Sequence, residues 1–419
     1  MRNNLLSNPR FLFFYLSRTS ANIADSIYMI VMLYFVQSIT ESVSYTSFTY
    51  SAITATSMFS FIVGPIVDRH SPLKLASLSL LMQAIIIFFV PFLIGEQSYK
   101  LILILVLVFL ASCFSLLFYP ANSKLIPILM RNNDDIIKAN VVINSTDQVI
   151  NIVGYLLGAS IIIFLGMKNT FYLASGLLLL AGLTFFWMSR NLIPSNYMEN
   201  EPAKHSGSFL LELKEGFSFV KQNVFLKIMM PFYALINFLL AMLIITIPSL
   251  AVSAGSPIYY SLIYIVFFIG MFCGSILTNY VPKKAFVIAV AWILMGISLC
   301  VFSLMQGIWL KMVAVLPMGI GSGLINVQQT AIIHIITPTK LLGRVLSFLS
   351  SISNASLPLG ALVGGVLTLR FPLENVLLFS AVLIMASGLI LLCIKTVRQF
   401  TIEDQTEERQ KEANVGGNF

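Results

Sequence analysis

The sequence predicts an all-α membrane protein with twelve transmembrane helices in two pseudo-symmetric six-helix bundles. Hydrophobic residues make up 58% of the 419 residues and charged residues only 10%, whereas about a quarter of an ordinary soluble domain is charged. Twelve apolar segments are each near the roughly 20 residues that a helix needs to cross a bilayer. The longest polar interruption divides these segments six and six. This composition excludes a soluble factor, a disordered chain and a disulfide scaffold.

The first bundle is expected over residues 1–189. A polar start runs directly into the first apolar segment, with no small-residue cleavage site after a short apolar core, so this segment is interpreted as a retained helix rather than a signal peptide. The six predicted spans are 11–37, 44–66, 75–94, 101–126, 137–165 and 169–189.

Residues 190–223 predict a cytoplasmic linker. Pro, Asn, Glu and Ser are abundant up to residue 207 and favour a flexible segment. Beyond it, apolar residues recur at three- and four-residue spacing while charged residues take the other faces, which predicts an amphipathic helix on the membrane surface. The apolar positions are Leu210, Leu213, Phe217 and Val220.

The second bundle is expected over residues 224–397. Its six predicted spans are 227–252, 257–281, 285–304, 308–336, 344–369 and 373–395. The last is the clearest, because no charge lies between Val376 and Ile394. The tail, 398–419, is charged and contains Gly and Asn, so disorder is expected there.

A glycine pair recurs in both halves. Gly154 and Gly158 lie four apart in the fifth span, and Gly360 and Gly364 lie four apart in the eleventh, 206 residues later. Small residues at this spacing let helices approach closely. The repeat indicates a duplicated bundle, which is the architecture of many secondary transporters.

The charge distribution predicts the orientation. With both termini inside, the cytoplasmic segments hold 20 of the 25 Lys and Arg residues, and the outer loops hold Lys100, Lys168, Lys311 and Arg370. This is the positive-inside pattern. The net charge of +8 is then explained by attraction to anionic lipid, and it gives no reason to expect nucleic-acid binding.

No motif predicts catalysis or a cofactor. The chain contains no GxxxxGK[S/T], HExxH, GxSxG or CxxC pattern. The glycines at 319, 321 and 323 fall inside an apolar run and indicate close helix packing. We therefore expect neither an enzyme nor a bound metal or cofactor.

Ionisable residues at membrane depth are the candidate functional groups, because charge there is costly. Asp25 lies near the middle of the first span, with Arg18 two helical turns earlier and Asn22 between them. Two interpretations are open and evenly weighted. In the first interpretation, Asp25 carries protons or contacts substrate. In the second, the charged residues form a pair that fixes the first helix to a neighbouring helix.

Further polar residues are candidates for lining a cavity. Asp147 in the fifth span has Asn144 and Asn151 at helical spacing, which predicts a polar stripe facing the interior of the bundle. A structural hydrogen-bond network is the alternative. In the second half, the uncharged candidates expected to face a central cavity are Asn237, Asn326, Gln328 and Gln329.

The loop between the second and third spans carries a family resemblance. It contains Gly64, Asp68-Arg69 and Lys74, and it resembles the signature loop of the major facilitator superfamily, in which these residue types lock a cytoplasmic gate. Ser71 and Pro72 stand where that loop usually has Gly and a basic residue, which leaves the strength of the gate open.

A wider pattern resembles the macrolide-efflux branch of that superfamily, which also includes siderophore exporters. It comprises Phe118-Tyr-Pro-Ala-Asn-Ser, Leu211-Glu-Leu-Lys-Glu-Gly216 and Leu342-Gly-Arg344. The resemblance implies the major facilitator fold and a proton-driven exporter in a bacterial inner or plasma membrane. Asp25 matches the acid of the branch's usual Gly-Asp pair, although Ala24 replaces the glycine.

We therefore expect export of an amphipathic small molecule, either a macrolide-like drug or a siderophore, by alternating access. Protons and the lipid bilayer are the other expected partners, and the protein is expected to be monomeric. A nutrient importer of the same fold is the first alternative. A non-transporting receptor or enzyme is the second, and the absence of a catalytic cluster argues against it.

Overall fold

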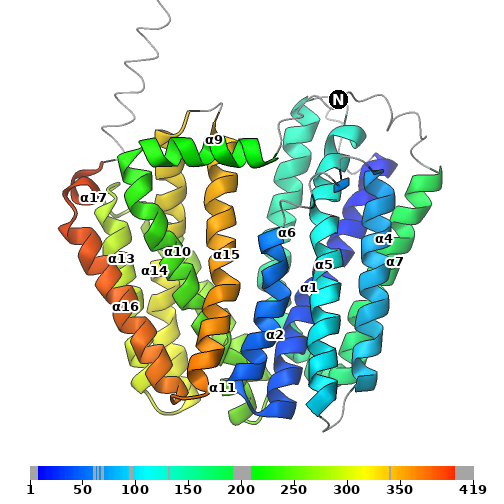
Figure 1. Cartoon of the computed structure of the whole chain (residues 1–419), viewed down its shortest axis with the longest axis horizontal. Helices are drawn as coiled ribbons and strands as arrows, with labels where there is room; N and C mark the ends of the chain where they lie inside the picture. The colour runs from blue at the N-terminus through cyan, green and yellow to red at the C-terminus, as the bar shows by residue number, and fades with distance from the viewer. Residues whose placement is uncertain are drawn as a thin grey trace, which may run out of the picture. The chain divides into compact units, whose positions relative to one another are not determined.

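The computed structural model describes residues 8–59, 63, 66–67, 70–93, 98–130, 133–191, 209–338 and 341–401. Within these ranges the chain is almost entirely helical (Figure 1), and the one β contact recorded there is an isolated bridge between Lys284 and Thr401. The chain forms two compact units. The first unit comprises Met1–Gly207 with Ala251–Ser261, and the second comprises Ser208–Leu250 with Leu262–Phe419.

The first unit begins with a long, well-capped helix. Asn8 accepts a hydrogen bond from the Arg10 N–H through Oδ1 (3.0 Å), and Pro9 occupies the first helical turn, where its missing N–H costs nothing. The helices of this unit are α1 (Pro9–Thr40), α2 (Val43–Ala55), the 3₁₀ helix η2 (Thr56–Phe59), α4 (Pro72–Phe89), the 3₁₀ helix η3 (Val90–Leu93), α5 (Ser98–Leu129), α6 (Asn133–Leu165) and α7 (Met167–Asn191).

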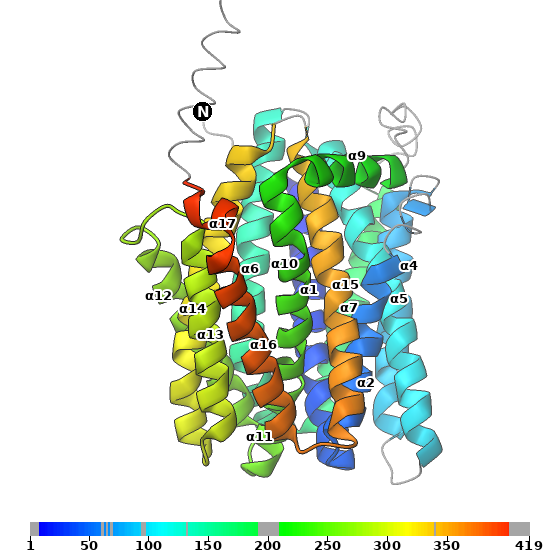
Figure 2. The same cartoon turned by 60° about the vertical axis from the view of Figure 1, so that its left-hand side comes forward.

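The second unit contains the remaining helices, among which α13, α14 and α16 lie close together (Figure 2). They are α9 (Phe209–Gln222), α10 (Val224–Ile244), α11 (Thr246–Ser253), α12 (Ile258–Leu277), α13 (Phe286–Leu304), α14 (Ile308–Ile336), α15 (Leu342–Thr368), α16 (Leu373–Cys393) and α17 (Lys395–Gln399). The end of α11 and the start of α12 belong to the first unit.

The predicted all-α membrane fold is confirmed. Ten helices in the described ranges are long and apolar enough to cross a membrane, and α6, bent by 52° between Lys138–Gly154 and Leu157–Leu165, makes up to eleven. The remaining predicted span, 44–66, begins with α2 and η2 and then enters residues outside those ranges. The chain is thus consistent with twelve spans.

Two predicted segments can be compared with the helices in detail. The seventh span, expected at 227–252, is one membrane-length stretch over Val224–Ser253, within which a turn at Ile245 separates α10 from α11. Pro248 explains the turn, because proline has no N–H and its ring clashes with the carbonyl four residues earlier. The tail was expected from residue 398. Helix α17 ends at Gln399, Phe400 packs on Phe225 with ring centroids 4.4 Å apart, and residues 402–419 lie outside the described ranges.

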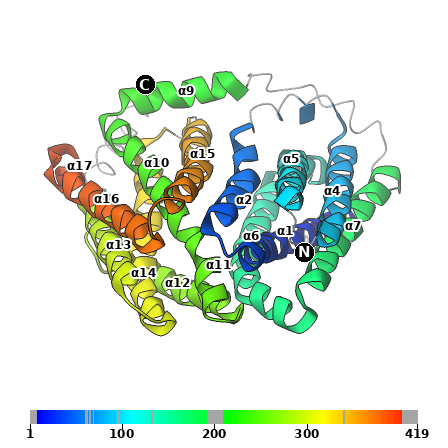
Figure 3. The same cartoon turned by 60° about the horizontal axis from the view of Figure 1, so that its bottom comes forward.

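The same helix contacts recur inside each unit. In the first unit, Gly154 and Gly158 bring α6 against Ser26 and Ile30 of α1. In the second, the matching pair on α15 packs against Phe238 and Met242 of α10. The third and sixth spans of each unit also meet at glycines. In the first unit the glycine is Gly182 on α7, and in the second the glycines are Gly296 on α13 and Gly388 on α16. Figure 3 shows α1 beside α6 and, separately, α10 beside α15.

Candidate transport site

A polar network lies at the middle of four helices of the first unit. Arg18, Asn22 and Asp25 follow one another at four- and three-residue spacing, which places them on one face of α1. Asp25 is 16 residues beyond Pro9, about 24 Å along the helix axis at 1.5 Å per residue. The other members come from α4, α5 and α6, so the network lies deep within apolar helices.

Asp147 of α6 forms the first cluster with α1. Arg18 Nη2 lies 2.7 Å from Asp147 Oδ2, and Asn22 Nδ2 donates to Asp147 Oδ1 at 2.5 Å. The Arg18 side chain is only 10% exposed and that of Asp147 24%. Both carboxylate oxygens are therefore engaged, and the pair is neutral overall.

Asp25 forms the second cluster, with neutral partners only. Gln83 Nε2 of α4 donates to Asp25 Oδ1 at 2.6 Å, and Tyr119 Oη and Ser115 Oγ of α5 donate to Oδ2 at 3.3 and 3.5 Å. Among the residues with described positions, no Lys, Arg or His forms an ion pair with Asp25. Its charge is thus stabilised by hydrogen bonds without a countercharge.

Tyr119 connects the two clusters. Its hydroxyl interacts electrostatically with Arg18 and Asp147 as well as with Asp25. The side chain is 41% exposed, unlike the buried Arg18. An aromatic ring at this position offers both a face for apolar or cationic groups and a hydroxyl. A ligand that reached Tyr119 would contact the residue that donates a hydrogen bond to Asp25.

Several buried polar atoms around the network lack a hydrogen-bond partner within the described part of the chain. They are Asn22 Oδ1, Gln83 Oε1, the Tyr28 hydroxyl and both polar side-chain atoms of Asn122. A buried polar group without a partner costs about 1–3 kcal/mol. Such groups are uncommon in folded proteins, and two of them belong to Asn22 and Gln83, which each donate to one of the two acids.

The structure brings three of the sequence candidates together. Asn22, which lies between Arg18 and Asp25 in the sequence, joins Arg18 at Asp147. The residues that hold Asp25 were not among the candidates. Gln83 is an amide in an otherwise apolar stretch of α4, which is a signal that points to it, and Tyr119 lies in the segment beginning at Phe118 that carried the family resemblance.

Other candidates lie partly outside what the structure describes. Asn144 and Asn151 belong to α6, but their side chains are not among the described ones. Gly64, Asp68 and Arg69 of the predicted gate loop are outside the described ranges, whereas Lys74 lies exposed in the first turn of α4.

In the described spans of the second unit, the predicted polar residues are not accompanied by a pair of acids like Asp25 and Asp147. Asn237 Nδ2 donates to the Tyr233 carbonyl of its own helix at 2.9 Å. Gln328 is buried and donates to the Pro282 carbonyl at 3.4 Å, Asn326 is exposed and Gln329 is half-buried.

An ion pair of the second unit lies at its linker helix. Glu215 of α9 pairs with Arg344 near the start of α15. A methyl group added at the adjacent Gly216 would lie 2.5 Å from the Arg344 carbonyl oxygen, so α9 is in tight contact with α15. The predicted amphipathic helix therefore packs on its own unit, and Figure 1 shows it crossing the ends of α10 and α15.

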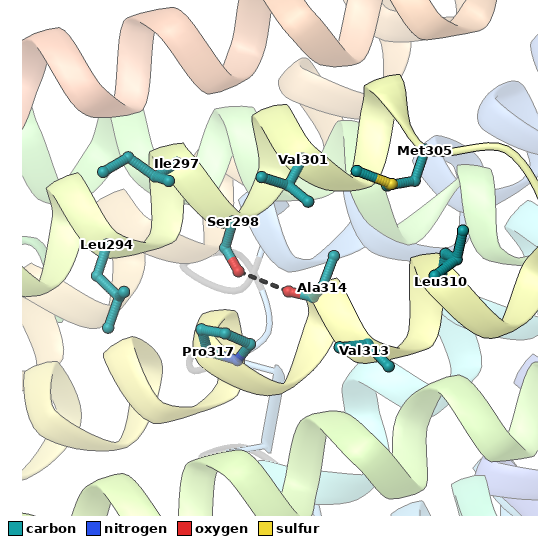
Figure 4. Close-up of a pocket in the computed structure, with 9 residues that line it drawn as sticks. All are labelled: Leu294, Ile297, Ser298, Val301, Met305, Leu310, Val313, Ala314 and Pro317. Atoms are coloured by element: carbon teal, nitrogen blue, oxygen red, sulfur yellow. Dashed lines mark hydrogen bonds between the residues drawn. The ribbon is translucent and has the colours of Figure 1, made fainter.

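A groove of about 300 Å³ between α13 and α14 is apolar (Figure 4). Its polar group, Ser298 Oγ, donates to the Ala314 carbonyl at 2.5 Å and is therefore satisfied. Val313 on its rim is 70% exposed. The groove contains no ionisable group and suits contact with lipid chains rather than chemistry on a substrate.

The network also does not resemble a metal site. Across the described ranges, no three His, Cys, Asp or Glu side chains gather closely enough to hold a metal ion. The arrangement can bind, orient and release a proton or a polar ligand group.

Comparison with known proteins identifies the family. The family model described as the Major Facilitator Superfamily matches residues 14–285 and 229–417. The chain belongs to this superfamily. It is therefore a multi-pass membrane transporter of the major facilitator fold rather than an enzyme.

Two relatives illustrate the range of similarity. The chain is 23% identical over 345 residues to YvqJ of Bacillus subtilis (strain 168), an uncharacterized MFS-type transporter, and the match covers 80% of each chain. It is 26% identical over 204 residues to macrolide efflux protein A of Streptococcus pyogenes, covering 47% of this chain and 50% of that protein. The resemblance to the macrolide-efflux branch is thus confirmed.

Solved structures agree in fold. The nucleoside transporter NupG has a TM-score of 0.68 at 14% identity, with 91% of this chain and 98% of that chain covered. An auto-inhibited POT-family peptide transporter has a TM-score of 0.67 at 12% identity, with 91% and 95% covered. Identities this low show a shared fold alone.

Proposed function

We propose that the protein is a proton-coupled exporter of an amphipathic small organic molecule. The observation that carries this proposal is the contrast between the two acids of the first unit. Asp147 is neutralised by Arg18, whereas Asp25 has hydrogen-bond donors but no cationic partner among the described residues. An uncompensated carboxylate at membrane depth is costly and is expected to be functional.

Asp25 would couple proton binding to a change of conformation. Protonation removes its charge and so lowers the cost of moving α1 through a less polar environment. The hydroxyls of Ser115 and Tyr119 can donate to the carboxylate or accept from the protonated acid, so both forms have partners. A proton shifts the equilibrium between two transport states only if its affinity differs between them.

The direction and substrate class rest on similarity. The match to macrolide efflux protein A favours outward transport of a large, partly apolar molecule. The half-exposed ring of Tyr119 is suited to contact with such a molecule. We further propose a bacterial cell membrane with both termini cytoplasmic, as the bacterial relatives and the basic inner loops favour.

The decisive test is Asp25→Asn in everted membrane vesicles energised by a proton gradient, with erythromycin as the probe macrolide. We expect concentrative uptake to be lost while the purified variant keeps the wild-type unfolding temperature. Asp135→Asn is the matched control, because Asp135 pairs with Lys138 on an exposed helix face (3.7 Å). Concentrative uptake at the wild-type rate in Asp25→Asn would contradict the coupling role.

A second experiment addresses the native substrate. Untargeted mass spectrometry would compare cells and medium of a deletion strain complemented with the wild type or with Asp25→Asn. A metabolite that is missing from the medium of the deletion strain and accumulates inside its cells identifies the substrate, whether a siderophore or another molecule. No change in native metabolites, together with macrolide accumulation in the deletion strain, favours drug efflux.

A further inference from the structure

Gln83 makes the shortest contact to Asp25. Its Nε2 lies 2.6 Å from Asp25 Oδ1, compared with 3.3 Å for Tyr119 and 3.5 Å for Ser115. The Gln83 side chain is 2% exposed and projects from the middle of α4. Its other end, Oε1, is buried without a hydrogen-bond partner in the described part of the chain. A glutamine thus presents one amide end to Asp25 and keeps the other unengaged.

We propose that Gln83 is the positioning residue that sets the proton affinity of Asp25, presenting its amide N–H to the carboxylate and its carbonyl oxygen to the protonated acid. This inference rests on the proposed function only in taking Asp25 as the group that exchanges protons. An amide is suited to the task because it has a donor end and an acceptor end of nearly the same size.

The two orientations follow from the chemistry of each state. When Asp25 is ionised, the Gln83 N–H forms a charge-assisted hydrogen bond, roughly twice as strong as a neutral one. When Asp25 is protonated on Oδ1, two donors would face each other. Rotation of the terminal torsion by half a turn, which is a soft and two-fold torsion, then brings Oε1 to the acid proton.

The unpartnered end of the Gln83 amide is consistent with rotation between these two orientations. In either orientation one end contacts Asp25 and the other does not, so the two states contain similar numbers of hydrogen bonds. A fully satisfied glutamine would resist rotation, since turning it would break a second bond. The unpartnered Oε1 of Gln83 is therefore the feature expected of an amide that changes partners.

Among the described residues, the other titratable groups near Asp25 are two tyrosines and one ion pair. Tyr28 of α1 and Tyr119 of α5 interact electrostatically with it. Arg18 and Asp147 pair with each other. The neutral groups that contact the acid are Gln83 and Ser115, and Gln83 is the nearer by 0.9 Å, so its removal should have the larger effect.

The test is an infrared titration of the full-length protein in lipid nanodiscs, which needs no substrate. The wild-type spectrum minus that of Asp25→Asn isolates the carbonyl band of the protonated Asp25, and its amplitude against pH gives the midpoint. In Gln83→Leu both forms of Asp25 lose a hydrogen bond, but the carboxylate loses the stronger, charge-assisted one, so the charged form is destabilised more. We expect the midpoint to rise by roughly one pH unit, since one unit corresponds to about 1.36 kcal/mol.

Gln37→Leu is the matched control. Gln37 is also 2% exposed in the same unit, and its Oε1 accepts from Thr46 at 2.7 Å, three turns along α1 from Asp25. We expect no shift there. Gln83→Met, which keeps the unbranched shape, replaces Gln83→Leu if the latter does not fold, with the same upward shift expected. An unchanged midpoint in the folded Gln83 variant, or an equal shift in Gln37→Leu, overturns the inference.

The two proposals fail separately. If Asp25→Asn still concentrates erythromycin, the coupling role of Asp25 is lost, whereas the infrared midpoint still reports whether Gln83 controls its protonation. If Asp25→Asn abolishes concentrative uptake and Gln83→Leu leaves the midpoint unchanged, the coupling role stands and only the inference about Gln83 is wrong.

Discussion

At the scale of single residues, Arg18 and Asp147 stabilise the first unit only as a pair. Each would be costly alone among apolar helices, and their 2.7 Å contact together with the Asn22 hydrogen bond compensates both charges. Removing one partner of a buried pair is more damaging than replacing both, because the remaining charge has no partner. This asymmetry separates the Arg18–Asp147 pair from Asp25, which has no countercharge among the described residues.

The asymmetry yields a prediction. Asp147→Asn leaves the Arg18 guanidinium without its countercharge, and we expect it to destabilise the protein by about 2–4 kcal/mol, somewhat less than a fully buried pair because Asp147 is partly exposed. The double variant Arg18→Gln/Asp147→Asn should recover part of this loss. Thermal unfolding of the purified proteins measures both, and equal losses in the single and double variants would contradict a compensating pair.

Sequence reasoning located the acids but not their partners. Asp25 and Asp147 are conspicuous because each is a charge within an apolar run. Which donor reaches which acid depends on the rotation of helices that are far apart in sequence, and Gln83 is 58 residues from Asp25. An amide within an apolar stretch marks Gln83 as unusual, but its contact with Asp25 is visible only in the packed structure.

At the scale of helices, the glycines divide into packed and open positions. A methyl group at Gly158 on α6 would collide with the Ile30 side chain of α1, and at Gly360 on α15 with the Phe238 backbone of α10. At Gly176 on α7 and Gly343 on α15, nothing lies within 4 Å of the added carbon. The close approach of the first and fifth spans of each unit therefore depends on particular glycines.

We predict opposite signs for alanine at the two classes. Gly158→Ala and Gly360→Ala should destabilise their units by on the order of 1–3 kcal/mol through overpacking. Gly176→Ala and Gly343→Ala should be neutral or stabilise by up to about 1 kcal/mol, since alanine favours the helix. Unfolding of the four variants in one detergent provides the measurement, and the same sign in both classes would refute the assignment.

Helix boundaries were predictable where the hydrophobic pattern was uninterrupted. The tenth span was expected at 308–336 and α14 covers Ile308–Ile336. The seventh was expected at 227–252 and lies within the single stretch Val224–Ser253, but hydropathy does not register the turn at Ile245 that precedes Pro248. Pro231, Pro317 and Pro358 lie inside α10, α14 and α15, so a proline alone does not predict where a membrane helix breaks.

At the scale of the whole molecule, the inner and outer loops differ in charge, and this predicts the orientation of every span. Helix α13 offers a matched test, because it connects an exposed basic turn at Lys283 with an exposed turn at Gln306. The positive-inside pattern places the first turn in the cytoplasm and the second outside.

We expect Gln306→Cys, in a background lacking the four native cysteines, to react with a membrane-impermeant thiol reagent in intact cells. Lys283→Cys in the same background should react only after the membrane is opened. If Lys283→Cys reacts in intact cells and Gln306→Cys does not, the topology is the reverse of the one proposed. Equal labelling after permeabilisation is the control that both cysteines are accessible.

The sequence was sufficient for the architecture of the molecule because that architecture is repeated. Twelve apolar segments, a central polar linker and the glycine pairs 206 residues apart each point to two similar bundles. The internal contacts of each unit agree, since the fifth span packs on the first and the eleventh on the seventh. Repetition gives the same signal twice, whereas, among the spans that the structure describes, the pair of acids occurs in the first unit and has no second copy to support it.

The pairing of Arg18 with Asp147 also has a consequence for synthesis. The two residues are 129 positions apart, and a ribosome adds about 5–20 residues per second, so α1 is made roughly 6–26 s before its countercharge exists. During that interval a guanidinium must be held at the translocation channel, in water or near lipid headgroups. The first helix therefore reaches its paired state only after the fifth span has been made.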